Sequence, residues 1–367
     1  MNKTDYIVIG GGIIGMSTAR ELAVRGASVA LFDRGELGME SSWAAGGIIS
    51  PMRPWAESCE SVLLSEYSKK LYPNYVEELK QETGVDSEYI KSGLVIIDEE
   101  HAAKTRQWAA DKKIKTIDNI GQNSSDIKLP DYSVLLPEIA QVRPPKLLKA
   151  LRKSLEKLSV SIFENTEITG LEINSNVVQS VEFDGGNAMA DAIIITAGAW
   201  SNSILKNINA EIDIKPIHGQ ILCVKPDEQI TGQMILDGPH YFIPRKDGHL
   251  LIGSTMEDIG FINQTTKEGR QDLLDWAYSM EPSLKKAIPV SHWSGLRPST
   301  KIGKPIIGQV PNFKNIYLNT GHFRKGILQA PASARLIADS IQGKKSFMDI
   351  EEFAVEYKKI SLEPDAV

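Results

Sequence analysis

Three glycines near the N-terminus have the spacing that phosphate-binding turns use. Gly10, Gly12 and Gly15 form the pattern Gly-x-Gly-x-x-Gly, and Asp33 follows eighteen residues after the last of them. The first glycine allows a tight turn, the second lets the backbone approach a pyrophosphate, and the third lets a helix pack on a strand. An acidic side chain at this distance accepts hydrogen bonds from ribose hydroxyls. The pattern therefore predicts a dinucleotide site.

A strand, a helix and a second strand must surround these glycines for the site to form. Residues 6–9 are a short apolar run, typical of a strand buried on both faces. Apolar and small residues then recur at helical spacing until Gly26, and residues 29–32 predict the second strand. This β-α-β unit directs helix N–H groups and the positive end of a helix dipole toward the phosphates.

The glycine pattern alone fits NAD as well as FAD. The chain is expected to return to the same sheet late, at residues 192–200 and again at 316–341. An extended cofactor contacted by such distant segments favours FAD over a dissociable nicotinamide.

The rest of the chain predicts an α/β protein. Helices are predicted at 61–81, 144–158, 267–281 and 327–341, with a surface helix and loop at 99–131; strands are predicted at 92–97, 160–163, 168–173, 177–183, 192–196 and 316–318. Between 216 and 253, short strands alternate with Pro and Gly turns, as in an antiparallel sheet.

Composition excludes several classes of protein. The 367 residues carry a net charge of −6, whereas a general nucleic-acid binder needs clustered Lys and Arg. Two cysteines, Cys59 and Cys223, exclude a disulfide framework and indicate a reducing compartment, so we expect a cytoplasmic protein. The sequence contains no apolar run of about eighteen residues, so we expect no integral membrane association. No metal-binding constellation is present.

Five motifs in this order resemble the D-amino-acid oxidase family of flavoproteins. They are Val-Ile-Gly-Gly-Gly-Ile-Ile-Gly (8–15), Ser-Ser-Trp-Ala-Ala-Gly-Gly (41–47), Tyr-Phe-Ile-Pro-Arg (241–245), Trp-Ser-Gly-Leu-Arg-Pro (293–298) and Gly-His-Phe-Arg-Lys-Gly-Ile-Leu (321–328). The resemblance covers nearly the whole chain. Within the family, the sequence is most similar to members of the thiamin pathway that oxidise glycine (ThiO type).

The resemblance implies a fold of two discontinuous domains, of the glutathione-reductase-2 type. A Rossmann-like FAD-binding domain would comprise residues 1–85, 145–215 and 290–367. An antiparallel-sheet domain of residues 86–144 and 216–289 would cover the flavin and hold the substrate.

The resemblance also implies the reaction. Glycine, sarcosine or a small D-amino acid would be oxidised to the imine, which gives glyoxylate and ammonia, while oxygen is reduced to hydrogen peroxide. The thiazole branch of thiamin biosynthesis would use the product. The alternatives are a D-amino-acid dehydrogenase that passes electrons to a membrane quinone, a sarcosine oxidase, and a flavoprotein that modifies tRNA; the acidic pI of about 5.7 disfavours the last. A homo-oligomer is expected, as for the relatives.

FAD would be bound without a covalent bond. Sarcosine oxidases that attach their flavin carry a cysteine in the late flavin segment, and residues 295–330 contain none. The residues expected to contact FAD are Gly10, Gly12, Ile13, Ile14, Gly15, Asp33, Ser41, Ser42, Ala45, Gly46, Gly47, Ile168, Ala197, Gly198, Gly321, His322, Phe323, Arg324, Gly326 and Ile327. The N-terminus of the last helix would stabilise the anionic reduced flavin through its dipole.

Substrate binding requires a group that orients a carboxylate, and a planar, bidentate arginine suits this role. The family motif places its carboxylate arginine at Arg297. Tyr241 is expected to donate a second hydrogen bond, although a strand residue of this type can also be core. The main-chain carbonyl of Arg324 would accept from the amine. The pocket is expected to include Ile49, His240 and Met256. No catalytic base stands out, since hydride transfer from a neutral amine needs none.

Overall fold

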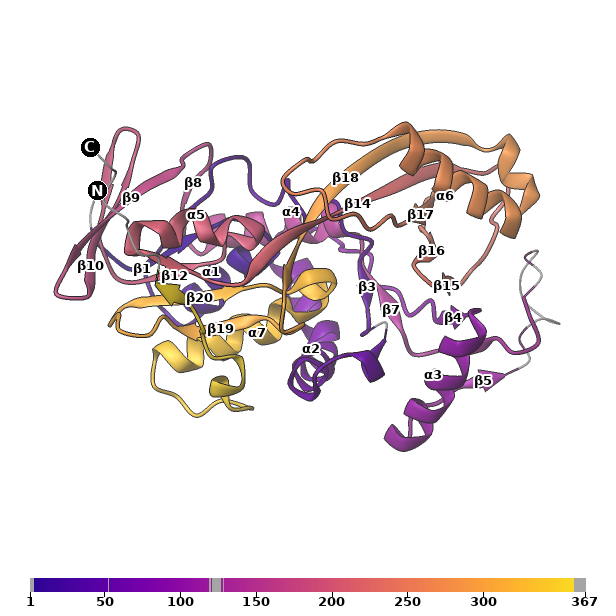
Figure 1. Ribbon diagram of the computed structural model, residues 1–367, viewed down its shortest axis with the longest axis horizontal. Helices are drawn as coiled ribbons and strands as arrows, with labels where there is room; N and C mark the ends of the chain where they lie inside the picture. Colours follow the sequence, from indigo (N-terminus) through magenta and orange to yellow (C-terminus); the bar gives the residue numbers. More distant parts are fainter. Residues whose placement is uncertain (1–2, 52, 119, 121–126, 128, 360–367) are drawn as a thin grey trace.

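Two β-sheets, each with its own helices, organise the chain (Figure 1). The structure is a computed structural model that describes residues 3–51, 53–118, 120, 127 and 129–359. Residues 119, 121–126 and 128 of the predicted surface loop lie outside the described residues. Both ends of the described chain lie near the six-stranded sheet (Figure 1).

The six-stranded sheet carries the predicted β-α-β unit. Its order is β19 (Ile306–Gln309), β20 (Ile316–Thr320), β12 (Ala190–Ile195), β1 (Thr4–Ile9), β2 (Val29–Phe32) and β8 (Ser161–Phe163). All neighbours are parallel except β19 and β20. The prediction that segments far apart in sequence meet in one sheet is confirmed.

Both faces of this sheet are covered, as the apolar run in β1 requires. On one face, Val8 packs with four helices: α1 (Ile13–Val24), α2 (Cys59–Thr83), α4 (Pro144–Lys157) and α7 (Gly326–Ile341). On the other face, Ile7 and Ile9 pack with α5 (Ser201–Leu205) and a three-stranded sheet of β9 (Ile168–Asn174), β10 (Val177–Phe183) and β11 (Gly186–Ala188). Side chains alternate between these cores because successive strand residues face opposite ways.

The second sheet has eight strands. Its order is β18 (Ile288–Thr300), β14 (Ile214–Lys225), β17 (Leu250–Gly253), β16 (His240–Pro244), β15 (Met234–Asp237), β4 (Leu94–Ile96), β6 (Val134–Leu136) and β5 (Ile117–Asp118). One face packs against α6 (Lys267–Met280). The helix α3 (Glu99–Lys112) contributes Ala102 to the core on the other face. The sheet is antiparallel except for the pair of β15 and β4, which is parallel.

Short elements complete the fold. They are β3 (Ile48–Ile49) paired with β7 (Ala140–Gln141), β13 (Ala210–Glu211) paired with β21 (Lys358–Lys359), and the 3₁₀ turns η1 (Pro54–Ala56), η3 (Gly198–Trp200), η4 (Lys206–Ile208), η5 (Pro282–Lys286), η6 (Phe323–Lys325) and η7 (Ile350–Phe353).

The long antiparallel pair of β14 and β18 crosses a domain boundary that the sequence analysis predicts. The predicted domain boundary at residue 290 falls inside β18, which pairs with β14 along its length in the eight-stranded sheet. The sequence pattern for a strand is weak here because β18 contains two prolines, Pro289 and Pro298, and its first four residues are exposed. The division into two domains stays a prediction.

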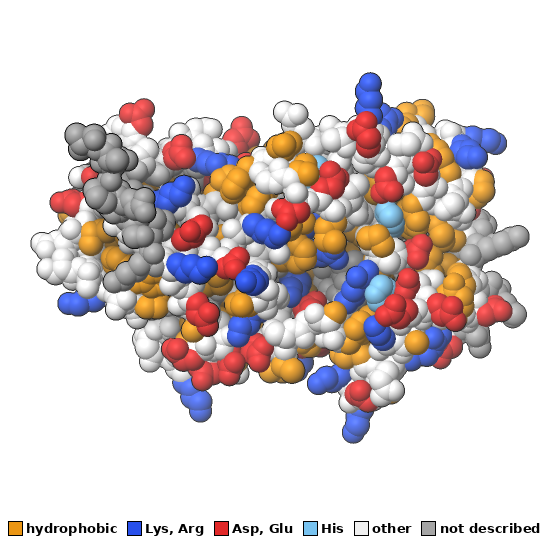
Figure 2. All heavy atoms as spheres, in the orientation of Figure 1, with side chains coloured by type: hydrophobic (Ala, Val, Ile, Leu, Met, Phe, Trp, Pro, Cys, Tyr) orange, Lys and Arg blue, Asp and Glu red, His pale blue; other side chains and the backbone are white. Residues whose placement is uncertain are grey.

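The surface of the molecule is mixed in charge. Figure 2 shows acidic and basic side chains interspersed over the face in view. None of the helices in the described part of the chain is both long and apolar enough to cross a membrane.

Candidate functional site

A cavity of about 440 Å³ is lined by residues of both sheets. From the six-stranded sheet come Gly10, at the end of β1, and Ala197, after β12. From the eight-stranded sheet come Gly219 on β14, Tyr241 on β16 and Arg297 on β18. The glycine motif and the predicted substrate residues therefore line one and the same cavity.

The glycine motif packs as its spacing predicts. Gly10 has a φ of +108°, and a Cβ there would lie 2.7 Å from the carbonyl oxygen of Thr196. A Cβ on Gly15 would lie 1.8 Å from the Gly10 oxygen, so Gly15 lets α1 pack on β1 and does not itself line the cavity. The helix α1 begins at Ile13; its N-cap residue, Gly12, has no side chain to cap it and its first turn has no acidic residue, so its positive dipole end is available to an anion.

Asp33 lines the cavity at the end of β2. Its carboxylate accepts backbone N–H bonds from Gly11 at 2.6 Å and from Gly35 at 2.8 Å. Burial is the largest influence on this group and raises the pKa of Asp33. The two bonds fix the carboxylate beside the glycine turn, and each oxygen keeps a lone pair for a ligand hydroxyl.

The small residues of segment 41–47 form one side of the cavity, and they make hydrogen bonds both to α1 and to the segments of the eight-stranded sheet. Ser42 Oγ accepts from the Ile13 N–H at 2.9 Å, and Ser41 donates to the Leu296 carbonyl of β18. Arg245 Nη2 donates to the Gly46 carbonyl at 2.7 Å. A Cβ on Gly46 would lie 2.9 Å from the terminal methyl of Ile243, so a larger residue would require this side chain to shift. Other wall residues of this segment are Ala45 and Gly47.

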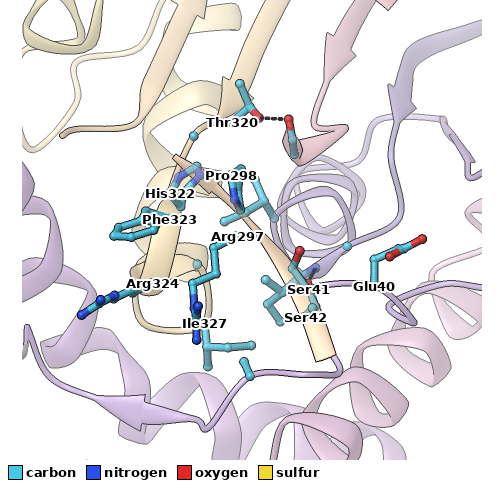
Figure 3. A pocket seen from close by; sticks show the side chains of 18 of the residues that line it. Glu40, Ser41, Ser42, Arg297, Pro298, Thr320, His322, Phe323, Arg324 and Ile327 are labelled. Atoms are coloured by element: carbon cyan, nitrogen blue, oxygen red, sulfur yellow. Dashed lines mark hydrogen bonds between the residues drawn. The ribbon is translucent and has the colours of Figure 1, made fainter. Parts of the chain in front are cut away.

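Two further groups of predicted residues line the cavity. Ile168 and Gly198 lie near the first β-α-β unit, where Arg34 also stacks on the ring of Trp200 at 4.1 Å. At the start of α7 the lining residues are Gly321, His322, Phe323, Arg324, Gly326 and Ile327. Figure 3 shows Arg297 and Arg324 on the opposite side of the pocket from Glu40, Ser41 and Ser42.

Three hydrogen bonds to the protein hold Arg297 in the lining of the cavity. Its Nη1 donates to the carbonyls of His218 at 3.3 Å and Thr255 at 3.2 Å, and its Nη2 donates to Ser254 Oγ at 3.0 Å. The guanidinium occupies the space above Gly219, where a Cβ would lie 2.0 Å from Nη1. Burial lowers the pKa of Arg297, but no carboxylate pairs with it among the described residues. A guanidinium so placed is suited to an external anion.

Tyr241 lies beside Arg297 and is 6% exposed. Burial, the largest influence, raises the pKa of Tyr241, so the phenol stays protonated at neutral pH and can donate. The Ser254 hydroxyl interacts with both Tyr241 and Arg297. A Cβ on Gly253 would lie 2.5 Å from the Tyr241 oxygen, which explains the glycine at the end of β17.

The segment before α7 is strained and contains buried polar atoms. Phe323 has a φ of +48°, which is uncommon for a bulky residue. Residues with such backbone angles are found most often at functional sites. Burial and the nearby Lys325 ammonium lower the pKa of His322 to about 3, so its imidazole is neutral. Within the described chain, His322 Nε2 and Asn319 Oδ1 have no hydrogen-bond partner, and both residues line the cavity.

Three residues predicted for the substrate pocket do not line the cavity. Ile49 is fully buried in the helix-covered core, and its neighbour Ile48 lines the cavity instead. His240 Nε2 lies 3.2 Å from Asp272, and its ring stacks against the α6 side of the sheet. Met256 is 55% exposed, although its sulfur contacts Arg324.

Several lining residues were missed by sequence reasoning. Arg53 lines the cavity, and its Nη2 donates to the Gly238 carbonyl at 2.7 Å. Lys325 also lines the cavity and pairs with Glu57, another lining residue, at 2.9 Å. Neither Arg53 nor Glu57 belongs to a motif, so only the fold brings them to the site. Within the described part of the chain there is no cluster of His, Cys, Asp or Glu that could hold a metal ion.

The cavity fits a dinucleotide such as FAD. Glycines keep its walls free of side chains where a Cβ would clash, the N-terminus of α1 lines it, and two lining residues, Asn319 and His322, carry buried polar atoms without a partner in the described chain. The residues that would hold the cofactor therefore run from Asp33 and Gly12 to the start of α7 at Gly326.

Comparison with known proteins agrees with this geometry. The family model described as FAD dependent oxidoreductase (DAO) matches residues 5–340. The chain is 38% identical to a glycine oxidase of Pseudomonas aeruginosa, over 95% of this chain and 97% of that protein. It is 30% identical to a bifunctional protein ThiO/ThiG of Trichormus variabilis, covering 93% of this chain and 53% of that protein.

Among solved structures, a glycine oxidase of Geobacillus kaustophilus is similar with a TM-score of 0.91 and 26% identity, over 97% of this chain and 99% of that one. The family resemblance seen in the five motifs is thus confirmed over nearly the whole chain. The chain belongs to the family of FAD-dependent oxidoreductases that includes these proteins.

Proposed function

We propose that this FAD-dependent oxidoreductase is a glycine oxidase that also accepts sarcosine and small D-amino acids. The observation that carries the proposal is the meeting, in one cavity, of the glycine motif with a guanidinium that has no carboxylate partner among the described residues. The relatives named glycine oxidase support it. Glycine, water and oxygen would give glyoxylate, ammonia and hydrogen peroxide.

Arg297 would bind the substrate carboxylate. Its guanidinium has five N–H donors, and the three bonds to His218, Thr255 and Ser254 leave two for a carboxylate. Tyr241, protonated and adjacent, would donate another hydrogen bond. Held in this way, the α-carbon would have one orientation in the cavity.

The amine would lie near the main-chain carbonyl of Arg324, which would accept a hydrogen bond from it. Bound FAD supplies the two-electron oxidation of the α-carbon, and oxygen then reoxidises the flavin. No side chain is needed as a base: His322 is neutral with a pKa of about 3 and cannot be the group that titrates near neutral pH. Water can take the ammonium proton.

FAD would be bound noncovalently between Asp33 and the start of α7. The α7 N-terminus has no acidic residue in its first turn, and its positive dipole end would stabilise negative charge on the cofactor. Acid precipitation should therefore release the yellow colour into the supernatant. Colour that stays in the pellet would show a covalent bond.

We further propose that the enzyme acts in the cytoplasm, in the thiazole branch of thiamin biosynthesis, as a homo-oligomer. Both cysteines are free, which suits a reducing compartment. The likeness to the ThiO/ThiG protein supports the pathway. Ile288 and Val290 are 73% and 51% exposed on the edge strand β18, which supports association between copies.

The decisive experiment is anaerobic addition of glycine to the purified holoenzyme. Loss of the visible flavin absorbance, followed by its return with oxygen and formation of peroxide, is expected. Reduction by glycine without reoxidation by oxygen would indicate a dehydrogenase. Reduction by sarcosine alone would indicate a sarcosine oxidase.

A further inference from the structure

Besides Arg297, three arginines line the same cavity: Arg34, which pairs with Glu40, and Arg53 and Arg324. Arg53 Nη2 donates to the Gly238 carbonyl, and Arg324 Nη2 lies 2.6 Å from the sulfur of Met256, which is a weak acceptor. Neither forms an ion pair with an Asp or Glu in the part of the chain that the structure describes. Each guanidinium therefore retains unused donors at the cavity.

The charges around them do not balance. Glu57 lines the cavity nearby, but the Lys325 ammonium pairs with it at 2.9 Å, so the two charges cancel. The guanidinium groups of Arg53, Arg297 and Arg324 remain without an acidic partner among the described residues, and the carboxylate of glycine would neutralise one. The excess positive charge suits a ligand with more than one negative group.

The arginines also affect one another. Burial, together with the positive charges of Arg297 and Arg53, lowers the pKa of Arg324 to about 10. Arg324 is exposed and lines the cavity, and nearby protein atoms still disfavour its charge. It stays charged at neutral pH, and an anion bound there would relieve the repulsion.

We propose that Arg53 and Arg324 form a second anion subsite, and that the enzyme also oxidises N-substituted glycines whose N-substituent ends in a carboxylate. The inference rests on the proposed function, because Arg297 must hold the first carboxylate. The second carboxylate belongs on the nitrogen side, since the Arg324 main chain lies where the amine is expected and its side chain extends from the same residue.

The reaction balances for iminodiacetate, the simplest such compound. The α-carbon and the nitrogen together lose two electrons and two protons, and oxygen gains both to become hydrogen peroxide. Water then hydrolyses the imine to glyoxylate and glycine. The glycine released is itself a substrate of the proposed oxidase.

The kinetic test compares iminodiacetate with its neutral isostere, N-(carbamoylmethyl)glycine. Wild-type holoenzyme should prefer the dianion in kcat/KM by roughly tenfold to a hundredfold. Arg53→Gln should reduce this preference at least tenfold, Arg53→Lys should restore part of it, and Arg106→Gln, on the exposed helix α3, should leave it unchanged. Equal kcat/KM for dianion and isostere in the wild type would overturn the proposal. So would a preference for D-aspartate, which would place the second anion on the α-carbon.

A binding test separates this proposal from the proposed function. Diglycolate has two carboxylates and no amine, so it cannot be oxidised in this way; methoxyacetate has one carboxylate. Calorimetry of the holoenzyme should show tighter binding of diglycolate, and Arg53→Gln should remove most of the difference. If no amine is oxidised but diglycolate still binds more tightly, the function is wrong and the subsite stands. Equal affinities would refute the subsite even if glycine is oxidised.

Discussion

Replacement of Arg297 by lysine tests the carboxylate anchor most directly. Arginine uses three of its five N–H donors on His218, Thr255 and Ser254 and retains two for substrate. Lysine has three donors and no planar fork, so it keeps the charge but cannot satisfy the protein and bind a carboxylate bidentately. The loss is about one charge-assisted hydrogen bond, or roughly 1.5–3 kcal/mol. The kcat/KM for glycine should fall roughly tenfold to 150-fold.

Anaerobic stopped-flow reduction measures this effect. Both the apparent Kd for glycine and the limiting rate of flavin reduction should worsen in Arg297→Lys, because a tilted substrate misplaces its α-carbon. Arg106→Lys is the matched control, because Arg106 is a partly exposed residue that pairs with Asp118 and does not line the cavity. If Arg297→Lys keeps kcat/KM within about threefold of wild type with full FAD content, the charge but not the fork matters and this reasoning is wrong. If the variant loses FAD, Arg297 is structural.

Three other predictions follow from the geometry. Gly219→Ala places a Cβ 2.0 Å from Arg297 Nη1, so kcat/KM for glycine should fall at least about tenfold while FAD is retained; Gly232→Ala, with only one atom within 4 Å, should have no effect in the same assay. Asp33→Ala removes an acceptor from the glycine turn, so titration of apoprotein should show FAD affinity about tenfold to a hundredfold weaker; unchanged affinity would remove Asp33 from the site. His322 has a folded pKa of about 3, below the 6.5 of an unfolded histidine, so the unfolded state binds its proton first and stability falls as pH drops below about 6.5, by about 1.4 kcal/mol per pH unit. Urea unfolding of His322→Gln at pH values across this window should show a correspondingly smaller loss; an equal loss would mean that another group titrates.

The sequence by itself determined the features that depend on neighbouring residues and those recognised from motifs in a fixed order along the chain. The glycine spacing and the apolar runs of β1 and β2 predict the β-α-β unit, because turn geometry and burial on both faces restrict residue type over a few positions. The helices α2, α4, α6 and α7 follow from apolar residues at helical spacing. Arg297 and Tyr241 were found through motifs, and both line the cavity.

What only the tertiary structure decided is which side of each strand faces the cavity. Tyr241 lines it, so the preceding His240 faces α6; likewise Ile48 lines it, so Ile49 enters the core. Side chains alternate along a strand, and a motif that places a segment at the site cannot tell the two faces apart. Arg53 reaches the cavity through no local pattern. Its position depends on how two sheets pack together, which is a property of the whole chain.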